Sequence, residues 1–510
     1  MNLGVFLAIS PLLVVSTGGV LLMVAEAFSR RREETDGRVA GPSSELALGT
    51  AVTLLAGAVF SLAIFLVGPD KVEGASAVAP YLLVDRFSLF FSFVLCLGGA
   101  LASLLAGGYL PEHKLDRGEF YPLLTFSTVG CMILASAGDM LSLFLGLETM
   151  SLGVYALTGF RRGSTRSVEA AVKYFLLGSF AAALLLYGIA LIYGTTGHTD
   201  LVGIREAITA APAAGAKAPN LAVVLVALAL ILAGLAFKVG AVPFHMWTPD
   251  VYEGAPTPAT TYMAVAVKSA AFATLLRVLV VAFGDPGSTS WAAGWPPVVA
   301  VLAVLTMTVA NFIAGRQESV KRMLAYSSIA HAGYILVGVV STMRAGADGQ
   351  ASVMFYLLTY TVSTVGAFGA LILCGSRGAE AVSFEDLAGI GKRHPAAAAA
   401  FSLFLLSLVG VPPTAGFFGK FYIVKATMGA GLFPLAVILL LNSALAAYYY
   451  LRVLVYMYMR EPAPGAPFAR PMRSGYVATA LVVAAILVIV LGIWPSRSLE
   501  FAIQAALPTP

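Results

Sequence analysis

The sequence predicts an all-α, polytopic membrane protein of about 14 transmembrane helices, with two inverted five-helix repeats and with helices seven and twelve broken. Three observations support this prediction. Of the 510 residues, 59% are hydrophobic and only 11% are charged, whereas soluble domains carry about 25% charged residues. Apolar runs long enough to cross a bilayer recur along the whole chain. Two of these runs combine a lysine with a proline or glycine interruption.

A bilayer-spanning helix needs about 20 consecutive, mostly apolar residues. By this measure, spans are expected over residues 3–29, 45–67, 86–109, 119–137, 139–160, 167–194, 220–242, 257–283, 296–315, 319–341, 350–375, 397–428, 431–458 and 475–495. The first run lacks a basic start and is too long for a signal core, so it is interpreted as a span. The run over 397–428 exceeds one straight span and contains Pro412 and Pro413, which predicts a break.

The spans divide the chain into four expected parts. They are a three-helix segment over 1–118, a first five-helix repeat over 119–284, a second, inverted repeat over 285–460, and a C-terminal helix over 461–510. No soluble domain is expected. The stretch FEDLAGIGKRHP at 384–395 is interpreted either as a short interfacial helix or as an ordinary solvated loop.

The basic residues of the loops predict the orientation of the chain, because cytoplasmic loops are enriched in lysine and arginine. One set of loops carries Arg30, Arg31, Arg32, Arg38, Lys114, Arg117, Arg161, Arg162, Arg166, Arg316, Lys321, Arg322, Lys392, Arg393, Arg460, Arg470 and Arg473. The opposite set carries only Lys71, Arg205, Lys217, Arg344 and Arg497. Both termini are therefore expected on the non-cytoplasmic side.

The two interrupted spans suggest an internal symmetry. In FKVGAVPFHMW, Lys238 precedes Pro243, whereas in VGVPPTAGFFGKFYIVK, Lys420 follows the proline pair. The order of lysine and proline is thus reversed between two spans that are expected to cross the membrane in opposite directions, as in an inverted repeat. Interrupted helices at corresponding positions of two repeats mark the ion sites of transporters. The alternative is that proline and glycine are simply frequent in membrane helices.

Several ionisable residues lie deep in the apolar spans, where a central charge costs about 3 kcal/mol. Glu148 is expected to be a proton-relay acid paired with Lys238, and the alternative is a static ion pair. Lys268 lies too deep in its span to reach water easily. Lysine can exchange its proton when desolvated, whereas arginine stays protonated. Lys420 is expected to act in the same way, and Lys425 to anchor the interface.

His331 is a candidate intermediate in the relay, with Ser327 one turn away on the same helix face. The alternative is a hydrogen-bonded packing histidine. His245, beside the first break, is interpreted as either interfacial or functional. Asp139 is expected to be a helix cap. The side chains of three cations near span ends are expected to reach towards the interface, namely Lys173, Arg277 and Arg452.

The sequence gives no sign of a cofactor, metal or nucleotide site. Cys96, Cys131 and Cys374 are scattered and form no CxxC pair, so neither disulfides nor an iron–sulfur cluster is expected. Five histidines over this length do not favour a bis-histidine haem. Nucleotide-binding glycine motifs are absent. The net charge of +5 is divided among membrane loops, so no nucleic-acid partner is expected.

Four stretches resemble the antiporter-like subunits of respiratory complex I, the bacterial NADH:quinone oxidoreductase. They are LFLGLETMSLGVYAL, AFKVGAVPFHMWTPDVYEGAPTP, KRMLAYSSIAHAGY and GVPPTAGFFGKF. Lysine at position 420 is similar to the subunit N branch of that family and unlike the subunit M branch. The lack of a long lateral helix distinguishes the chain from the subunit L branch.

The resemblance implies a proton-translocating subunit of a bacterial inner-membrane complex. The relay of the family maps onto Glu148, Lys238, Lys268 and Lys420, with His331 as an intermediate. NAD, flavin, iron–sulfur clusters and quinone would be used by partner subunits. The expected partners are the antiporter-like subunits M and L, small membrane subunits and the lipid bilayer.

Two other functions remain open at this stage. The first is a subunit of a multi-chain Na⁺/H⁺ antiporter, which co-purification with iron–sulfur proteins would argue against. The second is a membrane scaffold in which the buried charges form inert ion pairs.

Overall fold

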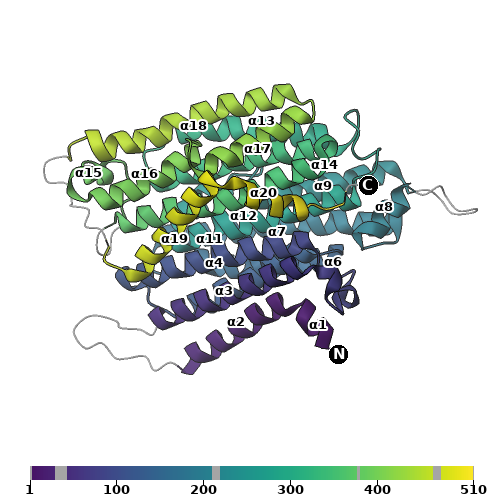
Figure 1. Ribbon diagram of the computed structural model, residues 1–510, viewed down its shortest axis with the longest axis horizontal. Helices are drawn as coiled ribbons and strands as arrows, with labels where there is room; N and C mark the ends of the chain where they lie inside the picture. Colours follow the sequence, from purple (N-terminus) through teal and green to yellow (C-terminus); the bar gives the residue numbers. More distant parts are fainter. Residues whose placement is uncertain (1–2, 29–42, 210–218, 376–379, 463–471, 509–510) are drawn as a thin grey trace, which may run out of the picture.

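The prediction of an all-α membrane protein is confirmed. The computed structural model describes residues 3–28, 43–209, 219–375, 380–462 and 472–508. Within these ranges the regular structure is helical, and strand-like pairing is limited to isolated bridges such as Leu82 with Ala137. The helices form one bundle whose long helices run side by side (Figure 1).

The helices of the first half are α1 (Leu3–Ala8), α2 (Ser10–Phe28), α3 (Ser43–Val67), η1 (Pro69–Lys71), η2 (Ala75–Val78), α4 (Arg86–Glu112), α5 (Phe120–Ser136), α6 (Met140–Thr158), α7 (Thr165–Thr196), α8 (Leu201–Thr209), α9 (Leu221–Val239), α10 (Trp247–Gly254), α11 (Thr257–Tyr262), η3 (Met263–Val267), α12 (Lys268–Arg277) and η4 (Val278–Ala282). The helices of the second half are α13 (Trp295–Ala314), α14 (Val320–Leu373), η5 (Glu385–Leu387), α15 (Ile390–Arg393), α16 (Pro395–Val409), α17 (Ala415–Gly429), α18 (Phe433–Met459), α19 (Gly475–Ile493) and α20 (Pro495–Gln504).

Eleven of the helices in the described ranges are long and apolar enough to cross a membrane. Two shorter apolar helices, α5 and α16, add to them. The spans expected over 319–341 and 350–375 join within α14, which turns at Gly346, where φ is 54°. A positive φ of this kind favours glycine. These helices do not by themselves establish the expected number of about 14 spans.

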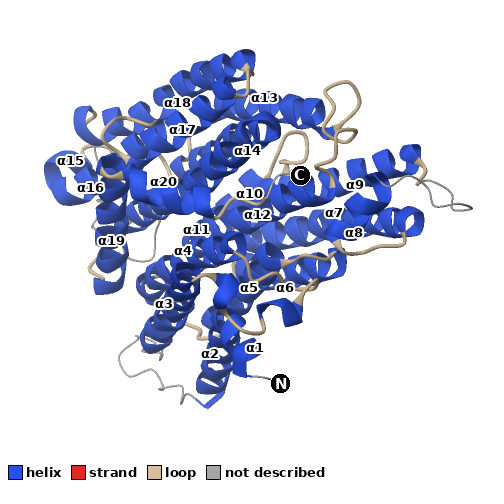
Figure 2. Cartoon of the chain, turned by 45° about the vertical axis from the view of Figure 1, so that its right-hand side comes forward, coloured by secondary structure: helices blue, strands red, loops and turns tan. Residues whose placement is uncertain are grey.

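The buried centre of the bundle consists of α4, the segment from α11 to η4, and α14. Pairs of neighbouring helices pack around this centre, including α5 with α6, α7 with α9, and α13 and α17 with α14. Figure 2 shows the N-terminal helices α2 and α3 beside α4 and α5, and α13, α17 and α18 beside α14. Helices far apart in the sequence therefore meet along α14.

Local sequence explains where two central helices begin. Asp85 caps α4 in a reciprocal arrangement with Ser88, in which each side chain accepts from the backbone amide of the other residue. Asp139 caps α6 by accepting from the amides of Leu141 and Ser142, at 2.7 and 3.3 Å. Such caps satisfy the free N–H groups of the first turn. The prediction that Asp139 is a cap is confirmed.

The loops expected to be cytoplasmic meet at one end of the bundle. Arg161 and Lys321 share the carboxylate of Glu380, and Arg322 pairs with Asp250. Both chain ends lie towards the opposite end, which also holds α8 (Figure 1). The stretch 384–395 at the charged end forms two short turns, η5 and α15, before α16 begins. Other residues used for the orientation lie outside the described ranges, namely Arg30, Arg31, Arg32, Arg38, Lys217 and Arg470.

Arg277 corrects one expectation. Its side chain does not reach the interface but is 2% exposed, and it forms a two-point ion pair with Asp85, at 2.6 and 2.9 Å. It also donates to the carbonyl oxygen of Ala135 at 3.1 Å. Planar, two-point pairing of this kind suits arginine. The pair joins the start of α4 to α12, and no local pattern indicated it because Asp85 and Arg277 are far apart in the chain.

Candidate functional site

The two broken helices end in the same way. Helix α9 stops at Val239 and is followed by Gly240, with φ of 75°, and by a cis peptide before Pro243. Helix α16 stops at Val409 and is followed by Gly410, with φ of 90°, and by a cis peptide before Pro413. A left-handed residue after the last turn closes a helix, and glycine adopts it without steric cost. The helix therefore ends at the glycine, a few residues before the proline.

The breaks free backbone groups that need partners inside a membrane. After the first break, the amide of Val242 donates to the hydroxyl of Thr306 on α13 at 2.9 Å. The indole of Trp247 donates to the carbonyl of Phe237 at 3.0 Å. At the second break, Lys420 on α17 donates to the carbonyl of Val409 at 2.6 Å. The ammonium of Lys420 thus lies at the negative end of the α16 dipole.

Lys238 lies in the last turn of α9, and only 3% of it is exposed. Its ammonium donates to the hydroxyls of Ser151 at 2.8 Å and Tyr155 at 3.4 Å, both on α6. The ring centroids of Tyr155 and Tyr174 lie 5.4 and 5.7 Å from the nitrogen. Hydroxyls and aromatic faces stabilise the amine without neutralising its charge.

Glu148 does not form the expected ion pair with Lys238. It lies three residues before Ser151 and seven before Tyr155, so the three side chains share one face of α6. One carboxylate oxygen of Glu148 is buried, with no hydrogen-bond partner among the described residues. The acid therefore lies one turn from the hydroxyl that binds Lys238.

Lys268 is buried in the central span, with 2% of it exposed. A π-helical turn, η3, immediately precedes it, and such turns are frequent at functional sites. Its ammonium donates to the carbonyl oxygen of Ser328 at 2.6 Å and also to the hydroxyl of that serine. The ring of Tyr360 lies 5.9 Å away. The side chain faces α14 and not the lipid.

His331 lies on α14 between two tyrosine hydroxyls. Its Nδ1 is 2.6 Å from the hydroxyl of Tyr356, and its Nε2 is 3.1 Å from that of Tyr450. The hydroxyl of Tyr450 also bonds to Ser327, so the serine expected beside His331 reaches it through a tyrosine. Both ring nitrogens are used, which is the arrangement a bridging group needs.

Lys420 completes the row of buried amines. Besides Val409, its ammonium contacts the hydroxyl of Ser443 at 2.8 Å and lies 5.3 Å from the ring of Tyr334. Tyr334 packs edge-on against His331, with ring centroids 5.4 Å apart. Tyr334, one turn along α14 from His331, thus lies between the histidine and Lys420.

The structure brings together Lys268, His331 and Lys420 along α14, and Glu148 and Lys238 at α6. In the part of the chain that the structure describes, none of the three lysines forms an ion pair with a carboxylate, and no hydrogen-bonded series of side chains joins Lys238 to Lys268. Near Lys238, the hydroxyls of Tyr174 and Thr248 are buried without a partner in this part. Within the described ranges, the Nδ1 of His245 is buried and has no hydrogen-bond partner.

A buried ionic cluster at the charged end was missed by the sequence analysis, which treated Lys321 as a loop cation. Lys321 is 1% exposed, and its ammonium contacts Glu380 at 3.1 Å and the carbonyl of Ala255 at 2.7 Å. Glu380 also accepts from Thr257 at 3.1 Å and pairs with Arg161 at 3.4 Å. Only the position of Lys321 inside KRMLAYSS, at the start of an apolar helix, hinted at burial.

A second ionic cluster lies beside it, on α10. Asp250 pairs with Lys173 at 3.1 Å and with Arg322 at 2.9 Å. Burial acts to raise the pKa of Asp250, but the hydrogen bonds and charges of these two cations outweigh burial and lower the pKa below its ordinary value. The carboxylate of Asp250 therefore stays ionised, and its two ion pairs join α10 to α7 and to α14.

Replacing Glu380 by glutamine is expected to destabilise the fold by about 3 kcal/mol, because it removes the carboxylate that contacts the buried ammonium of Lys321. Thermal unfolding of the purified membrane protein measures this loss. The double variant Glu380→Gln/Lys321→Met should recover most of it. Glu461→Gln is the matched control, since that carboxylate is 85% exposed and pairs with an exposed lysine, Lys392. Equal stability of Glu380→Gln and wild type would contradict this prediction.

Residues 137–446 match the family described as "NADH:quinone oxidoreductase/Mrp antiporter, TM". A protein of Sorangium cellulosum named NADH-quinone oxidoreductase subunit N 1 is 78% identical over 507 residues, covering 99% of each chain. A Rhizobium meliloti protein named NADH-quinone oxidoreductase subunit N 2 is 43% identical, covering 98% of this chain and 97% of its own.

Solved structures show the same fold. A chain of respiratory complex I from Thermus thermophilus with bound aureothin has a TM-score of 0.76 and 34% identity, over 98% of this chain and 100% of its own. A chain of the Mrp complex from Dietzia has a TM-score of 0.81 at 23% identity, over 99% of this chain and 97% of its own. The second likeness concerns the fold alone.

Proposed function

The chain belongs to the family of transmembrane subunits of NADH:quinone oxidoreductases and Mrp antiporters, and from this premise we propose that it carries protons across the membrane as the antiporter-like subunit N of an NADH:quinone oxidoreductase. It is a multi-pass membrane subunit of that enzyme complex, as the resemblance of the four stretches indicated. Oxidation of NADH and reduction of quinone in partner subunits would drive the transfer. The alternative function, a subunit of a multi-chain Na⁺/H⁺ antiporter, is less supported, because the chain of the Dietzia Mrp complex shares only 23% identity with this one.

One observation carries the proposal. Lys238, Lys268 and Lys420 are all buried, and all are held by hydroxyls, carbonyls and aromatic rings in place of carboxylates. An amine held in this way is not locked in a static ion pair, and a desolvated lysine can exchange its proton. Charged groups kept inside a membrane at such cost usually mark an ion path. The reading as an inert scaffold of ion pairs is therefore disfavoured.

The proposed relay begins at Glu148 and reaches Lys238 through the hydroxyl of Ser151. Water would join Lys238 to Lys268. Beside Lys238, the buried hydroxyl of Tyr174 has no protein partner in the described ranges, which is typical of a water site.

From Lys268 the relay would follow α14. Ser328 binds Lys268, and the neighbouring Ser327 reaches His331 through Tyr450. Tyr334 then separates His331 from Lys420. The hydroxyls and the imidazole in this series can each donate and accept a proton. No hydrogen bond among the described residues joins Ser328 to Ser327 or His331 to Lys420, so water would have to bridge these two steps.

The proposed direction is from the cytoplasm to the other side of a bacterial inner membrane, with both termini on the non-cytoplasmic side. The matching breaks after Gly240 and Gly410 support the two inverted units proposed over 119–284 and 285–460. NAD, flavin, iron–sulfur clusters and quinone would be bound by other subunits, and subunits M and L and small membrane subunits would be its neighbours. No group of three or more potential metal ligands occurs in the ranges that the structure describes.

Gentle purification of the tagged chain tests the function. Iron–sulfur proteins and NADH:quinone reductase activity are expected to co-purify with the tag, and vesicles containing the purified assembly should acidify when NADH and quinone are added. Recovery of an assembly that exchanges Na⁺ for H⁺ without any NADH oxidation would overturn the proposal in favour of the antiporter.

A further inference from the structure

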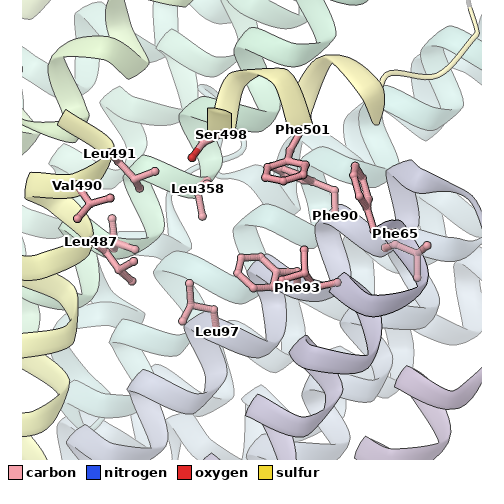
Figure 3. A pocket seen from close by; sticks show the side chains of 13 residues that line it. Phe65, Phe90, Phe93, Leu97, Leu358, Leu487, Val490, Leu491, Ser498 and Phe501 are labelled. Carbon is pink, nitrogen blue, oxygen red and sulfur yellow. The ribbon is translucent and has the colours of Figure 1, made fainter. Parts of the chain in front are cut away.

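An apolar crevice of about 250 Å³ lies between α3, α4, α14, α19 and α20. Thirteen residues from α3, α4, α14, α19 and α20 line it, and Ser498 is the only polar one. Figure 3 shows side chains such as Phe93, Leu97 and Leu487 converging on this space, with α20 lying across one end. The crevice does not contact the relay residues, so it needs its own explanation.

The position of the crevice matches one leaflet of a bilayer. Its lining on α4 runs from Leu89 to Leu97, a rise of about 12 Å, which is less than half of a hydrocarbon core about 30 Å thick. Leu66 on α3 and Ile486 on α19 are 62% and 54% exposed, so apolar surface continues outside. A space of this kind beside hydrocarbon is expected to be filled, because its lining otherwise loses dispersion contacts.

Two arginines, Arg86 and Arg497, lie near the end of the crevice at α20. Arg86, at the start of α4, lies 5.9 Å from the ring of Phe65, which lines the crevice. Its Nε is buried and has no hydrogen-bond partner within the described ranges. Arg497 on α20 is exposed and adjoins Ser498. The nearby carboxylate of Asp70 forms no ion pair with Arg86 in these ranges.

We propose that this crevice binds one acyl chain of an anionic phospholipid, whose phosphate lies at Arg86. The tail would occupy the space between α4, α14 and α19, where a hydrocarbon chain replaces missing packing contacts. The phosphate would pair with the guanidinium of Arg86, a partly exposed residue, whereas the charge of Arg497 is offset by Glu500 one turn later on α20. A basic group at this depth favours an anionic headgroup over a zwitterionic one.

Photo-crosslinking in the intact complex tests the site. Leu62, at the rim of the crevice, is replaced by p-benzoylphenylalanine, and the complex is placed in vesicles of equal parts phosphatidylglycerol and phosphatidylcholine. Illumination should give an adduct with the mass of a phospholipid, with phosphatidylglycerol favoured about fivefold, the preference that one basic residue provides. In the Arg86→Gln background the two lipids should be labelled equally.

The same probe at Phe312 provides the matched control, because that residue is 61% exposed on α13 and should label lipid in the bulk ratio in both backgrounds. Filling the crevice with Leu97→Trp should reduce the adduct at position 62 severalfold. Ser498→Trp should also reduce the lipid adduct. Ser498 lines the crevice at a partly exposed position, where a larger side chain does not disturb folding. An adduct to another protein subunit, or a lipid ratio that Arg86→Gln leaves unchanged, would overturn the proposal.

Discussion

Proton pumping driven by NADH oxidation is expected to fall at least about tenfold in the Lys238→Ala variant, because a positioned proton donor and acceptor contributes about 10²–10⁴ in rate. The assembled complex should remain intact. Since Lys238 forms no ion pair with a carboxylate among the described residues, its removal breaks no salt bridge and removes a desolvation cost. Stability is therefore expected to be unchanged or higher while pumping is lost.

Acidification of vesicles and thermal stability of the purified complex, measured on the same preparation, check this prediction. Glu148→Gln should reduce pumping in the same way, and Ser151→Ala should have a smaller effect because water can replace one hydroxyl. Lys425→Ala is the matched control, since that lysine is exposed on α17. A Lys238→Ala complex that pumps normally, or one that loses stability without losing pumping, would refute the relay and favour a structural role.

The second large effect is expected for Lys268→Arg. Arginine keeps the positive charge and can still donate to Ser328, but it stays protonated and cannot pass a proton on. Pumping should therefore fall as far as in Lys268→Ala, by at least about tenfold. If only the positive charge of residue 268 mattered, the Lys268→Arg variant would pump as the wild type does.

The comparison of Lys268→Arg with Lys268→Ala separates charge from proton exchange. Both variants are measured for NADH-driven acidification, with NADH oxidation and the amount of assembled complex as internal references. Lys425→Arg makes the same chemical change at an exposed lysine and should behave as wild type. Wild-type acidification by Lys268→Arg would show that the amine never gives up its proton, which would eliminate this step of the relay.

Much of the fold was predictable from short stretches of sequence. Apolar runs of membrane length become helices because the bilayer leaves no other way to satisfy the backbone. Asp139 could be recognised as a cap from its place just before an apolar run, and both breaks could be placed by proline and glycine. The glycine positions Gly240 and Gly410, where the helices end, were less visible than the prolines that follow them.

The partners of the buried charges were not predictable in this way. Lys238 was expected to pair with Glu148 but donates to Ser151, which is 87 positions away in the sequence. Arg277 was expected at the interface but pairs with Asp85, 192 positions away. The depth of a residue in its span follows from local sequence, whereas its contacts depend on how distant helices are rotated against each other.

The sequence by itself determined that this chain spans a membrane, where its helices break, and that three lysines lie at depths where a charge is costly. Only the tertiary structure decided that hydroxyls and carbonyls hold those lysines, that tyrosines of α14 and α18 flank His331, and that Glu380 neutralises Lys321. The physical reason is that the two properties depend on different parts of the chain. Burial is set by the apolar residues next along the chain, but a hydrogen bond closes within about 3 Å and requires packing that brings remote segments together.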